Sequence, residues 1–119
     1  MAGTREDATL MVELAKWGSM MQLDEAMRAI WADDFDPETA DVRDAPVQRT
    51  LLFNETLGTL VKNDLLDREL VYDWIWVEGI WSKVGPAALR AREQAGVSEL
   101  YANFEALAAG QRMAAGAPA

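Results

Sequence analysis

The hydrophobic pattern is strongest between Leu70 and Val84, where LVYDWIWVEGIWSKV holds three of the chain's five tryptophans. At roughly 100° per residue, Leu70, Trp74, Val77, Trp81 and Val84 share one face, and other apolar side chains fill most remaining directions. A helix that is apolar nearly all round is either buried by several neighbours or spans a membrane. Because a span needs about 20 mostly apolar residues and this run is shorter and carries three charges, the pattern predicts a buried central helix over residues 68–84.

A strand is the alternative for this stretch, since tryptophan, tyrosine, isoleucine and valine all favour strands. Strict alternation fails over residues 74–77, where four apolar side chains follow one another. Asp67 at an N-cap position and Glu69 in the first turn also suit the start of a helix. The local signals therefore favour a helix.

Helical periodicity, caps and breakers predict five further segments, at residues 5–18, 22–32, 46–62, 86–95 and 98–111. Thr4 and Asp7 have the spacing of a capping box, and Asp24 is suited to cap the second segment. Pro46 fits the first turn of the third, where its missing N–H would have no partner. Gly58, in the middle of that segment, is costly in a helix and indicates that another helix approaches closely there.

The later boundaries depend on residues that interrupt helices. Gly85 and Pro86 predict a break or a kink after the central segment, because proline cannot donate to the preceding turn. Gly96 is a typical C-terminal stop, and Ser98 can cap the last helix. We therefore predict an all-α fold, a compact bundle of five or six helices around a Trp-rich central helix. It forms one domain over 1–119, with 1–3 and 113–119 frayed.

Within this bundle, Trp74 and Trp81 are predicted to share the core with Leu57, Leu60 and Phe104. Truncation of such a buried tryptophan costs about 3 kcal/mol or more. Five tryptophans in a small domain more often fill its core than contact a ligand. A ligand-stacking role for them stays open beside this interpretation.

Charge and composition exclude several classes of function. With 11 basic and 20 acidic residues the net charge is −9, which repels nucleic acid and anionic membrane surfaces. Cysteine and histidine are both absent, which removes disulfides, the usual zinc sites and imidazole catalysis. The N-terminal residues do not form a secretory signal. We expect a cytoplasmic protein without a metal, a cofactor, a nucleic-acid partner or a membrane partner.

Residues 33–45 form the clearest predicted loop, DDFDPETADVRDA, which is rich in acids. The spacing of Asp34, Asp36 and Glu38 superficially suggests a calcium loop. That motif requires glycine at its sixth position and glutamate at its twelfth, where this chain has Thr39 and Ala45. A solvated connector is the favoured interpretation.

Candidate functional groups are the acids and aromatic residues that interrupt apolar helices. Tyr72, Asp73, Trp76, Glu78 and Glu55 are the candidate binding residues, and no catalytic residue is assigned. The alternative for the acids, including Glu105, is structural ion pairing with arginines. For Asp73, which interrupts the apolar face of the central segment, we expect pairing with Arg49 or Arg90.

The run from Leu52 to Leu107 resembles an uncharacterised bacterial family of small all-helical domains, described only as a domain of unknown function. The residues that carry the resemblance are Phe53-Asn54-Glu55, Gly58-Thr59-Leu60-Val61, Leu70-Val71-Tyr72-Asp73, Trp81, Pro86, Arg90 and Phe104-Glu105. The resemblance covers about half of the chain. It implies an all-α bundle and brings no known activity, substrate or cofactor. Some relatives look membrane-anchored by an added N-terminal span that this sequence does not show.

Two functions from different classes remain. The first is a non-catalytic helical interaction module, self-associating through surplus apolar surface around Trp76 and Tyr72. The second is a small-molecule binder or enzyme, with a Trp-lined pocket over a buried carboxylate such as Asp73 or Glu78. A strict monomer with an internal pocket would favour the second.

Overall fold

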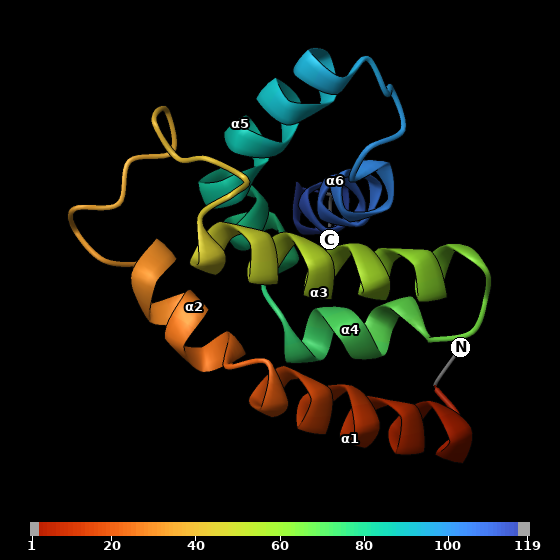
Figure 1. Ribbon diagram of the computed structural model, residues 1–119. Helices are drawn as coiled ribbons and strands as arrows, with labels where there is room; N and C mark the ends of the chain where they lie inside the picture. The colour runs from red at the N-terminus through yellow and green to blue at the C-terminus, as the bar shows by residue number, and fades with distance from the viewer. Residues whose placement is uncertain (1–2, 117–119) are drawn as a thin grey trace.

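The computed structural model describes residues 3–116, and all regular secondary structure in that range is helical. Six helices follow in order (Figure 1): α1 (Arg5–Met20), α2 (Leu23–Ile30), α3 (Ala45–Lys62), α4 (Arg68–Trp74), α5 (Val77–Ala95) and α6 (Ala102–Gly116). The predicted all-α fold class is confirmed. The predicted frayed ends fall partly outside the described residues, and α6 stays helical to its last described residue.

Helix α3 occupies the middle of the molecule, and in Figure 1 α4 lies below it and α6, seen end-on, lies above it. It packs against α2, α5 and α6. Val47, Leu51, Phe53 and Leu57 of α3 are almost completely buried. Other helices complete this core with Ile30, Val71, Val77, Val84 and Phe104.

The predicted continuous helix over 68–84 is wrong, because α4 ends at Trp74 and α5 begins at Val77. Between them Ile75 is extended, with φ −131° and ψ 133°. Val71 and Val77 are both fully buried. On one straight helix, side chains six residues apart would point about 120° away from each other. The break therefore allows a stretch that is apolar on every side to bury each half against a different part of the core.

Helix α6 holds the junction between α4 and α5. The side-chain N–H of Gln111 donates to the carbonyl oxygen of Ile75 at 3.1 Å, and its carbonyl oxygen accepts from the backbone N–H of Glu78 at 2.8 Å. One side chain thus satisfies a carbonyl and an amide that the broken helix leaves free.

The predicted break at Gly85-Pro86 is also wrong, since α5 continues through Pro86. Proline removes one helical hydrogen bond, the one that would reach the carbonyl of Ser82. Ser82 is exposed, so water can satisfy that carbonyl. Val84 and Ala87, on either side of the proline, are buried in the core. Tertiary packing of these flanking residues therefore keeps the helix continuous.

Several predicted caps are confirmed. Thr4 and Asp7 form both hydrogen bonds of the capping box at the start of α1. Asp67 accepts from the N–H of Leu70 at the start of α4, and Pro46 lies in the first turn of α3. Gly96 ends α5 in the left-handed conformation, with φ 68°. These ends are correct because each depends on residues adjacent in sequence.

Two predicted caps are wrong. The residue that precedes α2 is Gln22, with φ 59°, and Asp24 lies in the first turn instead. The last helix begins at Ala102 rather than at Ser98. Its first turn is fixed from another helix, because the Glu55 carboxylate of α3 accepts from the N–H of Phe104 at 2.9 Å.

Gly58 marks a close helix contact, as predicted. A methyl group at this position would overlap the backbone carbonyl of Asn103, at the start of α6. Glycine therefore lets α3 and α6 approach each other.

The two tryptophans predicted to share the core differ in environment. The Trp81 ring packs edge to face on Phe104, with ring centroids 4.9 Å apart. Trp74 is 37% exposed, so its predicted burial in the core is wrong. The helix break explains the difference, since it removes the common face that a continuous helix would give them.

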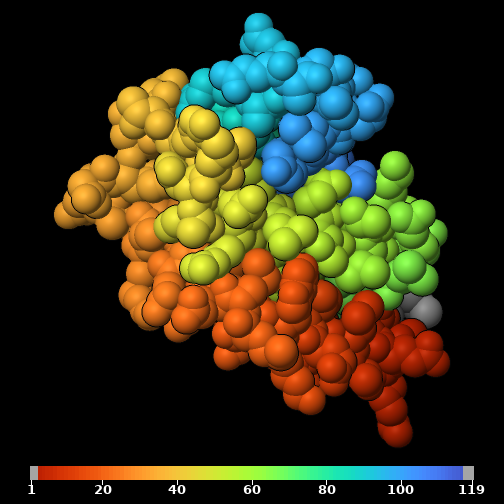
Figure 2. All heavy atoms as spheres, in the orientation of Figure 1, coloured from red at the N-terminus to blue at the C-terminus, as the bar shows by residue number. Residues whose placement is uncertain are grey.

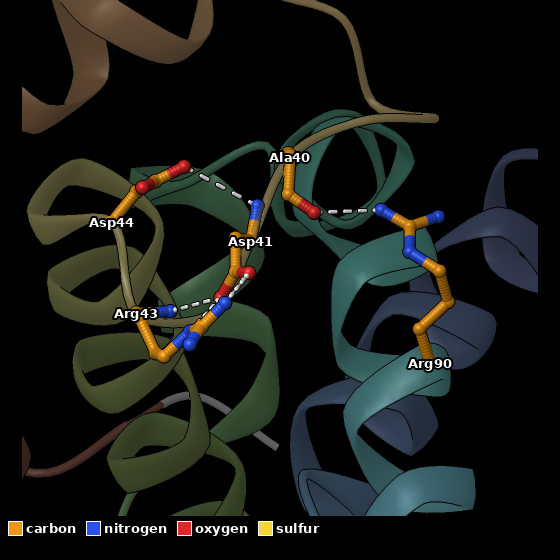
Figure 3. A network of polar contacts seen from close by, with 5 residues as sticks. All are labelled: Ala40, Asp41, Arg43, Asp44 and Arg90. Atoms are coloured by element: carbon orange, nitrogen blue, oxygen red, sulfur yellow. Dashed lines mark hydrogen bonds and ion pairs between the residues drawn. The ribbon is translucent and has the colours of Figure 1, made fainter.

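The acidic connector between α2 and α3 projects from one side of the molecule (Figure 2). Arg90 of α5 donates to its backbone carbonyls at Pro37 (2.9 Å) and Ala40 (2.7 Å), and Arg43 pairs with Asp41 at 2.7 Å (Figure 3).

The predicted pairing of Asp73 with Arg49 or Arg90 is wrong. Asp73 is exposed and makes no ion pair within residues 3–116.

Candidate functional site

A cavity of about 440 Å³ is lined by residues from helices α1 to α5. Helices α1 and α2 form one wall, α3 forms the floor, and the α4–α5 junction with the start of α5 forms the other wall. Its lining is mainly apolar and consists of Ala15, Gly18, Ser19, Leu23, Asp24, Met27, Phe53, Asn54, Trp74, Ile75 and Ile80. A volume of this size suits a small organic molecule.

The floor is built by two consecutive residues of α3, Phe53 and Asn54. The Phe53 ring stacks on Trp17 of α1 at 5.4 Å, and Trp74 meets it edge to face at 6.2 Å. Aromatic contacts of this kind add to the stability gained from burial. The three rings therefore fix the floor and both walls relative to each other.

The wall formed by α1 and α2 depends on a tight turn and on a small residue. The chain bends at Gln22, with φ 59°, and α2 then places Leu23 and Met27 in the lining. At Gly18 an added Cβ would lie 3.3 Å from the Phe53 ring and 3.4 Å from Leu23. These contacts are tighter than usual, so glycine lets the wall come close to the floor.

The opposite wall is a product of the helix break. Trp74 and Ile75 lie at the end of α4, and Ile80 follows on the first turns of α5. Because Gln111 bonds to backbone groups on both sides of the break, it also positions these lining residues.

Asn54 is the distinctive polar residue of the cavity. It is 1% exposed, and its Nδ2 donates to the carbonyl oxygen of Thr50 at 2.9 Å. That bond fixes which side of the amide carries the nitrogen. Its Oδ1 is buried and has no hydrogen-bond partner in the part of the chain that the structure describes. An unpaired buried acceptor costs about 1–3 kcal/mol.

The remaining polar groups of the lining lie at the rim. Asp24 is exposed, and its carboxylate is 3.6 Å from the guanidinium of Arg28, in a pair whose side chains are both 72% exposed. Ser19 is also exposed. In the part of the chain that the structure describes, Asp24 is the one ionisable lining residue, so these residues offer no pair of groups for acid–base catalysis. The arrangement is suited to binding an apolar molecule.

An exposed aromatic pair continues the surface beyond the cavity. Trp31 follows Met27 by one turn, and Trp76 directly follows Ile75. Their rings stack at 5.7 Å with an interplanar angle of 12°, and the Lys83 ammonium lies 5.0 Å from the Trp31 ring centroid. Trp76 remains 62% exposed and Trp31 42% exposed.

The structure does not bring the five candidate binding residues from the sequence together. Glu55 caps α6, and the Tyr72 hydroxyl donates to the Leu107 carbonyl at 2.8 Å; burial raises the pKa of Tyr72. Asp73 is exposed, Trp76 stacks on Trp31, and Glu78 contributes its backbone N–H to Gln111.

None of these five residues is in the cavity lining. Sequence reasoning missed Phe53, Asn54 and the small residues of α1. One signal for Asn54 is present in the sequence, because it is an amide that directly follows three large apolar residues, Leu51, Leu52 and Phe53. No comparable signal marks Gly18 or Ser19 as lining residues.

Within residues 3–116, no three acidic side chains gather closely enough to hold a metal ion. Among the helices of the same range, none has the length and apolar composition required to cross a bilayer.

The chain belongs to a family defined by a domain of unknown function, DUF4760, whose model matches residues 1–111. The match extends beyond the resemblance seen in the sequence, because it includes α1, α2 and the acidic connector. No curated protein and no solved structure matches the chain.

Proposed function

We propose that this domain is a non-catalytic binding module whose cavity takes a small, mainly apolar ligand with one hydrogen-bond donor. The donor would reach Asn54, and the apolar body would lie against Phe53 and Trp74. The observation that carries the proposal is the buried, unpartnered Oδ1 of Asn54 at the floor of an apolar cavity of ligand size.

The energetics support a role for Asn54 in binding. In the free protein its unpartnered oxygen opposes folding, and an apolar side chain of similar shape would avoid this cost. Residues that lower stability in this way are typical of functional sites. Because Oδ1 is closed to solvent, a donor reaches it only after the side chains above it shift. Because Trp74 lines the same cavity, binding should change its environment.

A neutral fluorescent probe tests whether the cavity binds ligands. N-phenyl-1-naphthylamine is apolar, carries one N–H donor and becomes fluorescent when it leaves water. We expect saturable binding of one molecule per chain. Ala15→Phe, at the rim of the cavity, should block it.

Ala8→Phe provides the matched control, because Ala8 is also an exposed residue of α1 and lies outside the lining. This variant should bind the probe as the natural chain does. Equal binding by both variants, or no binding by the natural chain, would contradict the proposal.

A second candidate function is self-association through the exposed aromatic pair of Trp31 and Trp76. The exposure of Trp76 supports it, because aromatic residues are enriched at protein interfaces. Light scattering after gel filtration measures the mass in solution. A dimer that Trp76→Ser converts to a monomer would support this candidate, and a monomer at all concentrations would exclude it.

A further inference from the structure

We propose that the ligand of this cavity is an organic cation, an apolar body that carries a protonated amine. This inference rests on the proposed binding function and specifies the chemical class that the site selects. The amine would lie at the rim beside Asp24, with the apolar body inserted toward Asn54 and Phe53. Three observations support this inference: the hydrogen-bond acceptors of the lining, its aromatic rings and the acidic charge at its rim.

The lining offers two acceptors that suit a ligand with an amine and a second N–H. The Asp24 carboxylate can only accept. One N–H of the Asn54 amide donates to Thr50, and its Oδ1 is an acceptor without a partner among the described residues. Ser19 can do either. Among residues 3–116, no lysine or arginine contributes to the lining. An anionic ligand would therefore lack a charged partner, whereas an amine has one at the rim.

Aromatic rings add to this preference. Trp74 and Phe53 present π systems to the cavity, and the face of such a ring attracts a nearby cation. The molecule already shows this contact beside the cavity, where the Lys83 ammonium lies over the Trp31 ring. A ligand amine near the rim would experience the same attraction from Trp74.

The Asp24 carboxylate at the rim is only weakly neutralised by its neighbours. Arg28 is the basic residue paired with Asp24, yet the 3.6 Å separation and the exposure of both side chains make this pair weak. A ligand amine can therefore compete for the carboxylate. The net charge of −9 also favours the approach of cations over anions.

Four indole compounds of nearly the same shape show how the charge of the ligand affects its affinity. Tryptamine is a cation at neutral pH, tryptophol is neutral and indole-3-propionate is an anion, and each has the ring N–H that can reach Asn54. In 1-methyltryptamine that ring donor is replaced by a methyl group. Isothermal titration calorimetry at neutral pH and low salt measures the affinity of each compound.

We expect tryptamine to bind about fivefold more tightly than tryptophol, as one exposed ion pair supports, and indole-3-propionate to bind most weakly. Asp24→Asn should remove most of this difference, chiefly by weakening the binding of tryptamine. Glu25→Gln is the matched control, because Glu25 is an exposed acid next to Asp24 that does not line the cavity. It should keep the preference for tryptamine. Weaker binding of 1-methyltryptamine than tryptamine would place the ring N–H at Asn54.

The titrations distinguish failure of the cation proposal from failure of the proposed binding function. Equal affinities of tryptamine and tryptophol, or tighter binding of the anion, would overturn the cation class while binding of N-phenyl-1-naphthylamine persists. Absence of binding by all four indoles to a chain that binds that probe would also overturn it. Absence of binding by the probe and by the indoles would overturn the binding function itself.

Discussion

The side-chain amide of Asn54 donates to the carbonyl oxygen of Thr50, one turn earlier in α3, at 2.9 Å. The bond orients the amide and leaves its own carbonyl oxygen buried without a partner in the described chain. A helix selected only for stability would have an apolar side chain at this position. Asn54 therefore lowers the stability of α3 and at the same time provides the acceptor that we propose for the ligand.

Replacement of Asn54 by leucine should leave the free energy of unfolding unchanged or raise it by up to about 1 kcal/mol, because an unpaired buried acceptor disappears. The same variant should bind N-phenyl-1-naphthylamine more weakly if the probe donates to Asn54. Urea denaturation and a fluorescence titration measure the two effects. Asn63→Leu is the control, because Asn63 makes the same bond to a carbonyl one turn earlier but is exposed at the end of α3. A loss of stability above about 2 kcal/mol in Asn54→Leu, as expected for a fully satisfied buried amide, would argue for a structural role.

Gln111→Leu should destabilise the fold by about 1–3 kcal/mol, because it removes two hydrogen bonds that span the α4–α5 break. It should also increase hydrogen exchange at the Glu78 amide, which loses its acceptor. Gln48→Leu, on an exposed position of α3, should change the urea midpoint little. Unchanged exchange at Glu78 would show that the junction is held by packing alone.

Truncation of Trp81 should lower the free energy of unfolding more than truncation of Trp76. Trp81→Ala removes a ring packed on Phe104 and should cost about 3 kcal/mol. Trp76 is 62% exposed, so Trp76→Ala should cost about 1 kcal/mol or less, chiefly from the lost stacking on Trp31. Thermal or urea denaturation of both variants checks the order. A larger loss for Trp76 would indicate that its ring is covered in solution, as in a self-associated form.

Acid titration should reveal the ion pair between Asp41 and Arg43 within the acidic connector. The hydrogen bond from the Arg43 side chain, with its backbone N–H, lowers the pKa of Asp41 to about 2. Because this pKa is lower in the folded chain than in the unfolded chain, the ionised carboxylate stabilises the fold above pH 4 and this contribution disappears as the pH falls toward 2. A carbon-detected NMR titration of Asp41 measures the pKa directly. Arg43→Gln should return it toward 3.8, the ordinary value for aspartate.

The sequence predicts well those features that neighbouring residues determine. The caps at Thr4 and Asp67 and the stop at Gly96 involve groups within a few positions of one another, so local chemistry is sufficient. The contact at Gly58 was also predictable, because a glycine that weakens a helix needs a compensating reason. These features establish the all-α class and most helix bounds.

The candidate site depends on features that local pattern does not contain. No glycine or proline marks the break at Ile75, which arises because Val71 and Val77 are both buried and because Gln111, more than 30 residues away in sequence, satisfies the freed groups. Pro86 is a local breaker that tertiary packing overrides. The cavity wall follows from that break, so the lining role of Trp74 and Ile75 could not be read from periodicity.

The most direct test of the binding proposal is a titration of ¹⁵N-labelled protein with N-phenyl-1-naphthylamine, followed by NMR. The side-chain amide of Asn54 and the indole N–H of Trp74 should shift together and saturate at one probe per chain. The amide of Asn63 and the indole of Trp81 should stay in place. Shifts confined to the indoles of Trp31 and Trp76, with Asn54 unmoved, would contradict binding in the cavity.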